Sequence, residues 1–303
     1  MSTAMAALPR LLSLVPGPGV TLAVALYSGV AAAQGVPLDE LPQTARSMAM
    51  GGGMFGAATS TTSLYANPAG MALTRLYHID TSGLYDPTAS RWSLGGAVVD
   101  SSRTVAAGVG YTYSSISDSP DGRRTHDARL AVAMPLTDGI ALGVTARYMD
   151  ITGTSTGNTG PGQAFSGFTL DAGLAVHPAR WFSAGVTGFS LTNPDTTVTP
   201  LSVGGGLALM PVETLTLTAD VIYDMHSYDH PHGRYSGGVE FLAGQVPLRA
   251  GYVFDDGRGT QAVTGGLGWI DQAFGIEAAV RQEIVGGHQT TMLLNLRYFY
   301  RLL

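Results

Sequence analysis

The sequence predicts an all-β fold, a transmembrane β-barrel of about fourteen antiparallel strands. Three observations support this fold. Apolar and polar side chains alternate with period two in segments of roughly ten residues from residue 76 onward. The connections between these segments are alternately short and long, and a secretory leader precedes them. Ten residues at ~3.3 Å each, tilted by ~40°, span roughly the apolar thickness of an outer membrane. The length of the segments and their apolar alternation therefore both predict membrane-spanning strands.

Residues 1–33 have the pattern of a secretory signal peptide. Arg10 precedes a mostly apolar stretch, and Ala31-Ala32-Ala33 supplies an Ala-x-Ala processing site. A transmembrane helix is the competing interpretation, but Pro16-Gly17-Pro18-Gly19 would break such a helix. We therefore expect cleavage and a mature chain that starts near Gln34.

The composition also favours a membrane barrel over a soluble enzyme. Glycine supplies 41 of the 303 residues, and charged residues make up only 13%. The absence of cysteine excludes disulfides, thiolate metal sites and a cysteine-linked lipid anchor. The absence of lysine excludes a Walker-type phosphate loop. A net charge of −6 without a basic cluster argues against nucleic acid as a partner.

The candidate strands follow the alternation in order along the chain. They cover residues 76–85, 91–99, 103–113, 126–135, 139–150, 166–177, 181–191, 201–209, 214–224, 234–242, 245–254, 260–269, 272–282 and 290–302. Connections after even-numbered strands are tight, such as Leu136-Thr137-Asp138, His177-Pro178-Ala179-Arg180 and Ala243-Gly244. Those after odd-numbered strands are longer, such as 114–125 and 151–164. Since short turns are periplasmic in outer-membrane barrels, we expect both termini in the periplasm.

Each strand has an apolar face, expected to meet lipid, and a more polar face, expected to line the lumen. In the eleventh strand, for example, Leu248 and Tyr252 would face outward and Arg249 inward. A charge on the lipid face costs ~2 to 4 kcal/mol at the midplane. A soluble β-sandwich could show the same alternation, but it would not need so many ten-residue segments behind a signal peptide. The expected lumen-facing charges are Arg147, Asp171, Asp220, Glu240, Arg249, Glu277, Arg281 and Arg297.

The most specific motif lies between the signal peptide and the first strand, in residues 45–71. Its landmarks are Gly51, Gly52 and Gly53, followed by Asn67, Pro68, Ala69 and Gly70. This segment resembles the N-terminal region of the FadL-type hydrophobic-compound transporters and of the related PorV and PorQ barrels. In those families an Ala-Arg then Gly-Met-Gly-Gly stretch is followed by Asn-Pro-Ala-Gly. This chain departs from the pattern at Ala49, where glycine is usual, and at Thr59 and Ser60, where aspartate is frequent.

The resemblance implies that residues 34–75 fold back as a plug inside a barrel formed by residues 76–303. Physical reasoning agrees, because a barrel of this size encloses a lumen too wide for lining side chains alone to fill. In FadL-type proteins a hydrophobic ligand enters from outside and leaves sideways, beside a kinked strand, into the membrane. Gly95-Gly96 and Gly108 with Gly110 are the candidate kink positions. The residues expected to form an apolar ligand pocket, or alternatively to anchor the plug, are Met48, Met50, Met54, Phe55, Leu64 and Tyr65.

The resemblance leaves two functions open. The first is binding or passive transport of a fatty-acid-like hydrophobic compound across the outer membrane, with outer-membrane lipids around the barrel. The second, suggested by the compact PorV and PorQ barrels, is a docking barrel that holds a secretion or periplasmic protein partner. A long apolar pocket on the plug would favour transport, and an exposed apolar or charged loop cluster would favour docking.

An enzymatic function and a metal-binding function have weaker support from the sequence than transport or docking. His226, Asp229, His230 and His232 lie in one predicted external loop and could hold zinc or copper, although a solvated polar loop is the favoured interpretation. No Gly-x-Ser-x-Gly elbow or His-Glu-x-x-His zinc motif occurs in the sequence. We therefore expect no cofactor and no catalysis.

Overall fold

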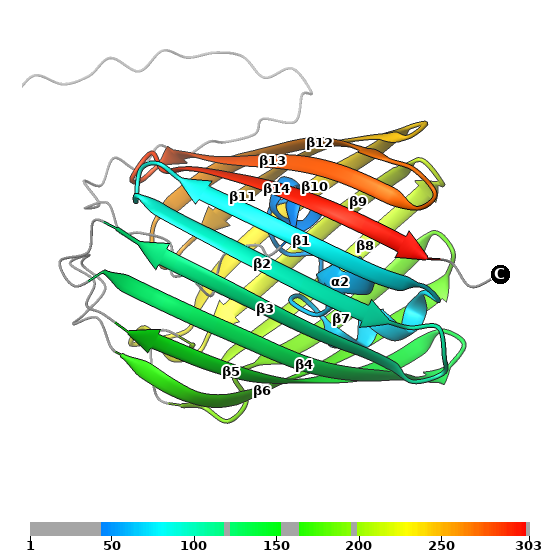
Figure 1. Cartoon of the computed structure of the whole chain (residues 1–303), viewed down its shortest axis with the longest axis horizontal. Coiled ribbons are helices and arrows are strands. Elements are labelled where there is room, and N and C mark those ends of the chain that lie inside the picture. Colours follow the sequence, from blue (N-terminus) through cyan, green and yellow to red (C-terminus); the bar gives the residue numbers. More distant parts are fainter. Residues whose placement is uncertain (1–43, 118–121, 153–163, 195–198, 301–303) are drawn as a thin grey trace, which may run out of the picture.

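The computed structural model describes residues 44–117, 122–152, 164–194 and 199–300. Within these residues, fourteen antiparallel strands close into a barrel, because each pairs with its neighbours in sequence and β1 pairs with β14 (Figure 1). The strands are β1 (Tyr77–Asp86), β2 (Arg91–Asp100), β3 (Ala106–Ile116), β4 (Arg123–Thr137), β5 (Ile140–Thr152), β6 (Phe165–Ala179), β7 (Phe182–Phe189), β8 (Ser202–Val212), β9 (Leu215–Asp224), β10 (His232–Ala243), β11 (Val246–Asp255), β12 (Thr260–Ile270), β13 (Phe274–Val285) and β14 (Thr290–Tyr300). The predicted signal peptide, and residues 34–43 of the predicted plug, lie outside the described residues.

The predicted strands and tight connections are all present, but the three predicted tight turns begin too early along the chain, since Ala243 also belongs to a strand, β10. Leu136-Thr137 belongs to β4 and His177-Pro178-Ala179 belongs to β6, so each strand runs further than expected. The register shifts between Pro135 and Thr137 in one ladder, and between Val176 and Ala179 in the other. Proline cannot donate a ladder hydrogen bond, and a bulge accommodates it without ending the strand.

The outer face of the barrel is apolar and has an aromatic girdle near each end. At the end with short connections, the exposed aromatic residues are Trp181, Phe241, Trp269, Phe274, Tyr298 and Tyr300. At the end with long connections, they are Tyr85, Trp92, Tyr111, Phe168, Tyr223, Tyr235 and Tyr252. Exposed aliphatic residues such as Val109, Leu130, Val132 and Leu294 lie between the girdles. This distribution is that of membrane-spanning barrels, and the predicted outward and inward faces are confirmed.

Residues 44–74, called the luminal segment below, lie inside the barrel (Figure 1). The segment contains two short helices, α1 (Ala45–Ala49) and α2 (Ser60–Ser63), and a 3₁₀ helix, η2 (Pro68–Leu73). Thr44 and Asn67 cap α1 and η2 through their side-chain oxygens. Because α1 contacts β11 to β14 and η2 contacts β3 to β6, the segment crosses the lumen from one wall to the other. Within the described residues, no helix has the length and apolar character needed to cross a bilayer.

Inward-facing glycines of the wall make room for this segment. A Cβ atom at Gly143 would lie 2.4 Å from the backbone of Pro68, and one at Gly185 would lie 2.1 Å from the carbonyl oxygen of Phe55. On the other side of the lumen, a Cβ atom at Gly238 would lie 2.6 Å from the carbonyl oxygen of Met50. Non-bonded carbon atoms need about 3.5 Å, so the path of the luminal segment depends on glycine at these positions.

The predicted kink positions are regular, and the irregular part of the wall lies elsewhere. The β2–β3 ladder runs from Arg91 to Asp100 without a register shift, and Gly108 and Gly110 face Met71 and Leu64 of the luminal segment. By contrast, the β6–β7 ladder reaches only to Ala172, opposite Gly188, although β6 begins at Phe165. We call the stretch beside residues 165–171 the β6–β7 seam. Two backbone donors close it: Leu191 N–H bonds Leu170 O at 2.8 Å, and Ser190 N–H bonds Asp171 Oδ1 at 2.8 Å.

Candidate functional site

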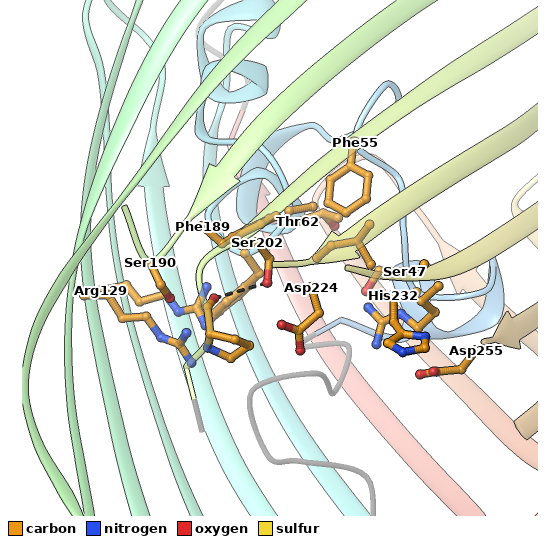
Figure 2. Close-up of a pocket in the computed structure, with 18 of the residues that line it drawn as sticks. Ser47, Phe55, Thr62, Arg129, Phe189, Ser190, Ser202, Asp224, His232 and Asp255 are labelled. Carbon is orange, nitrogen blue, oxygen red and sulfur yellow. Dashed lines mark hydrogen bonds between the residues drawn. The ribbon is translucent and has the colours of Figure 1, made fainter. Parts of the chain in front are cut away.

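A cavity of about 120 Å³ lies between the luminal segment and the long-connection end of the barrel (Figure 2). Its floor belongs to the luminal segment and includes Ser47, Phe55, Thr62, Tyr65 and Ala66. Its walls come from β4, β5, β7 and β9 and include Arg129, Arg147, Phe189 and Ile222. Its rim comes from strand ends and connections and includes Asp224, Tyr228, His232 and Asp255. The cavity therefore combines an apolar side, a cationic side and a polar rim.

The apolar side is centred on Phe55. Its ring lies 5.8 Å from the ring of Phe189, at an interplanar angle of 57°, and Ile222 also packs against the cluster that contains Phe55. The backbone of Phe55 is fixed from two directions. Its N–H donates to Asp220 Oδ1 at 2.8 Å, and its carbonyl oxygen accepts from Asn67 Nδ2 at 3.0 Å. Phe55 is thus held in one position by hydrogen bonds that involve its backbone alone.

The cationic side consists of two arginines that share one carboxylate. Arg129 and Arg147 stand directly opposite each other on β4 and β5, an arrangement that would destabilise the sheet if nothing compensated the like charges. Asp127 compensates them, because Arg129 Nη2 and Arg147 Nη2 donate to Asp127 Oδ2 at 2.9 and 2.7 Å. The Arg129 guanidinium also lies 4.9 Å from the centre of the Tyr65 ring. Burial raises the pKa of Tyr65 above its ordinary value, so its hydroxyl stays protonated and neutral.

A second ionic network lies around α1, away from the cavity. Arg46 of the luminal segment donates to Glu240 Oε1 at 2.7 Å, and Arg249 Nε donates to Glu240 Oε2 at 2.5 Å. Arg249 also pairs with Glu277, whose other oxygen lies 2.7 Å from Arg297 Nη1. These charge-assisted bonds connect the luminal segment to β10, β11, β13 and β14.

The sequence-predicted lumen-facing charges all occupy inward positions, but only Arg147 lines the cavity. Glu240, Arg249, Glu277 and Arg297 belong to the network at α1. The remaining three have separate partners: Asp171 with Ser190 N, Asp220 with Phe55 N, and Arg281 with Glu283. Sequence reasoning missed Asp127 and Arg129 of the cavity wall, although their spacing of two in β4 placed both on its inner face.

The six predicted pocket or anchoring residues divide into two groups. Phe55 and Tyr65 line the cavity. The other four are completely or almost completely buried outside it: Met48, Met50, Met54 and Leu64. Met48 packs in a cluster with Ala279 and Leu293 of the wall, and Leu64 packs with Val99. These four side chains are therefore buried away from the cavity, and their anchoring of the luminal segment stays a prediction.

The predicted plug motif supplies turns and close contacts. Gly51 and Gly52 have φ values of +89° and +90°, which side-chain-bearing residues rarely adopt. A Cβ atom at Gly53 would lie 2.4 Å from Asp220, and one at Gly70 would lie 2.2 Å from Ala58 O. Asn67 Nδ2 donates to Leu174 O of the wall at 3.0 Å. Pro68 and Ala69 lie against Gly143 of β5.

The histidine-rich connection does not assemble a metal site. Among the described residues, no group of three or more His, Cys, Asp or Glu side chains could hold an ion. Within the candidate set of His226, Asp229, His230 and His232, the rings of His230 and His232 lie 4.6 Å apart. His232 Nδ1 lies 3.3 Å from Asp256 Oδ2. The polar-loop interpretation and the weak metal-site candidate both remain predictions for these residues.

Solved structures of similar architecture include a hydrocarbon channel, a toluene transporter and a FadL homologue. CymD, a monoaromatic hydrocarbon channel, matches with a TM-score of 0.63 and 10% identity over 90% of this chain and 98% of its own. The Pseudomonas putida toluene transporter TodX matches with a TM-score of 0.63 and 13% identity over 84% of this chain and 97% of its own. A Pseudomonas aeruginosa FadL homologue matches with a TM-score of 0.58 and 11% identity over 89% of this chain and 99% of its own. No protein-family model and no curated protein matches the sequence. At these identities the likeness confirms the predicted barrel fold, while the resemblance to PorV and PorQ stays a prediction.

Proposed function

We propose that this chain is an outer-membrane barrel that binds a hydrophobic small molecule in the cavity above its luminal segment and conveys it across the outer membrane. The observation that carries the proposal is the apolar side of the cavity, where Phe55 of the luminal segment meets Phe189 and Ile222 of the wall. The hydrocarbon channels and toluene transporter of the same fold support it as analogies. With short turns in the periplasm, the cavity rim faces the cell exterior and both termini face the periplasm.

The route beyond the cavity is sideways. The luminal segment forms the cavity floor, and its burial against opposite walls blocks a straight path along the barrel axis. The β6–β7 seam adjoins Phe189 and Ser190 of the cavity wall. On the outside of the seam, Phe168, Leu170 and Leu191 present exposed apolar surface to the bilayer. A ligand that displaces the Ser190–Asp171 and Leu191–Leu170 bonds would reach lipid without meeting water.

The test is native mass spectrometry of the full mature protein, extracted gently from its own outer membrane, with bound lipids and small molecules identified in parallel. We expect a co-purifying apolar or amphiphilic compound. Phe55→Ala should reduce its occupancy about tenfold, since a buried aromatic contact of this kind contributes roughly 1 kcal/mol or more. Met54→Leu is the matched control, because Met54 neighbours Phe55 but does not line the cavity.

The same spectra distinguish the docking alternative. A stoichiometric protein partner, with no small molecule in wild type and no difference between the two variants, would contradict transport. That result would favour the secretion or periplasmic docking barrel.

A further inference from the structure

We propose that the ligand carries an anionic group, and that Arg129 and Arg147 recognise it while Phe55 and Phe189 hold its apolar body. The chemical class is a compact aromatic carboxylate, rather than a neutral hydrocarbon or a long acyl chain. The inference rests on the proposed function and adds a substrate class to it. Its basis is that both arginines line the cavity together with Phe55 and Phe189; Figure 2 shows Arg129, Phe55 and Phe189.

Both arginines line the cavity, and their hydrogen bonds to Asp127 leave one donor group of each guanidinium unused. Arg129 uses Nε and Nη2 on Asp127, at 3.0 and 2.9 Å. Arg147 uses the same two groups on Asp127 Oδ2, at 3.1 and 2.7 Å. The Nη1 group of each arginine lies outside these four bonds. Two Nη1 groups on opposed residues of neighbouring strands can donate to the two oxygens of one carboxylate.

The charges around the cavity place both arginines on one side. Both bond to Asp127, and the side chains of all three are buried. Asp171 is a second carboxylate that interacts electrostatically with the two arginines, and it also accepts a hydrogen bond from Ser190 N. The site is therefore charge-balanced without a ligand, and a ligand carboxylate would bind through the two Nη1 groups that Asp127 does not use.

Cavity size and shape select the apolar part of the ligand. A volume of about 120 Å³ is comparable to the ~150 Å³ of an engineered cavity that binds benzene. The cavity therefore admits one ring. The rings of Phe55 and Phe189 lie 5.8 Å apart and both line the cavity, so they supply aromatic contacts for a guest ring. Benzoate combines the ring with the carboxylate and is the probe that we choose.

Calorimetric titration of the purified full-length mature protein with benzoate, benzamide and toluene tests the inference. Benzamide has the shape of benzoate without its charge. We expect benzoate to bind at least about tenfold more tightly than benzamide. Arg147→Lys keeps the charge but loses the planar fork, so it should weaken benzoate about tenfold and leave benzamide unchanged. Arg297→Lys, in the network around Glu277, is the matched control and should change neither affinity.

A second variant guards against misfolding. The substitution Arg147→Gln leaves Asp127 bonded to Arg129, so no buried charge loses its only partner, and heat-modified migration on gels checks that the barrel is intact. This variant should lose the preference for benzoate. Equal or tighter binding of benzamide or toluene by wild type would overturn the anionic ligand and leave the proposed function standing. Binding of none of the three probes by a folded barrel, together with no co-purifying compound, would overturn both.

Discussion

Replacing one wall glycine tests whether the inner wall is shaped to the luminal segment. A Cβ atom at Gly143 would lie 2.4 Å from the carbonyl carbon of Pro68 and 2.5 Å from the nitrogen of Ala69. Both contacts are with backbone, so no side-chain rotation relieves them. Ordinary contact would need the segment to move by about 1 Å. Overpacking of this kind costs roughly 1 to 3 kcal/mol.

Gly205→Ala is the matched control, because its Cβ atom would lie 3.7 Å from the nearest neighbouring atom, the carbonyl oxygen of Gly185, which is an ordinary contact distance. The assay is urea unfolding in lipid vesicles followed by tryptophan fluorescence, with hydrogen exchange of the η2 amides measured in parallel. Gly143→Ala should lower the free energy of unfolding by about 1 to 3 kcal/mol and increase exchange in η2. Equal stability and equal exchange in the two variants would refute the reasoning.

Three further outcomes follow from the contacts of the luminal segment and the lipid face. Asp220→Asn should speed hydrogen exchange at Phe55 by roughly tenfold, because a neutral carboxamide accepts the bond from Phe55 N less strongly than a carboxylate. Unchanged exchange would contradict this role. Arg46→Met should destabilise α1 by about 1 kcal/mol. The cost stays this small because Glu240 keeps Arg249 as a partner. Hydrogen exchange of the α1 amides measures the change. Leu130→Arg should cost ~2 to 4 kcal/mol in vesicle unfolding if its outward position meets the bilayer midplane, and a cost near zero would contradict that position.

The alternation of apolar and polar residues predicted the strands and their faces because a period of two is a local property. It failed at the ends of β4 and β6, where residues 136–137 and 177–179 were predicted as turns but belong to strands that carry a bulge beside a proline. The glycine content fitted a barrel in general terms. The specific function of Gly143 or Gly185 became visible only when the luminal segment was placed against them.

The candidate site was predicted only in part, for a different physical reason. Phe55 and Arg147 could be singled out from the motif and from the inward face of a strand. The cluster of Asp127, Arg129 and Arg147 depends on which residues of β4 and β5 stand opposite each other. That register is set by the turn and the bulge after Pro135, which the sequence alone did not define. The β6–β7 seam likewise arises from the short length of β7 in three dimensions.

Uptake by intact cells tests the central claim most directly. Cells lacking the protein are compared with cells that display equal surface amounts of wild type, Phe55→Ala or Met54→Leu, and the initial uptake of radiolabelled benzoate and toluene is measured. Wild type and Met54→Leu should raise uptake of at least one compound well above the background, and Phe55→Ala should return it toward background. Background uptake in all strains, with the barrel folded and present at the surface, would contradict transport through the cavity.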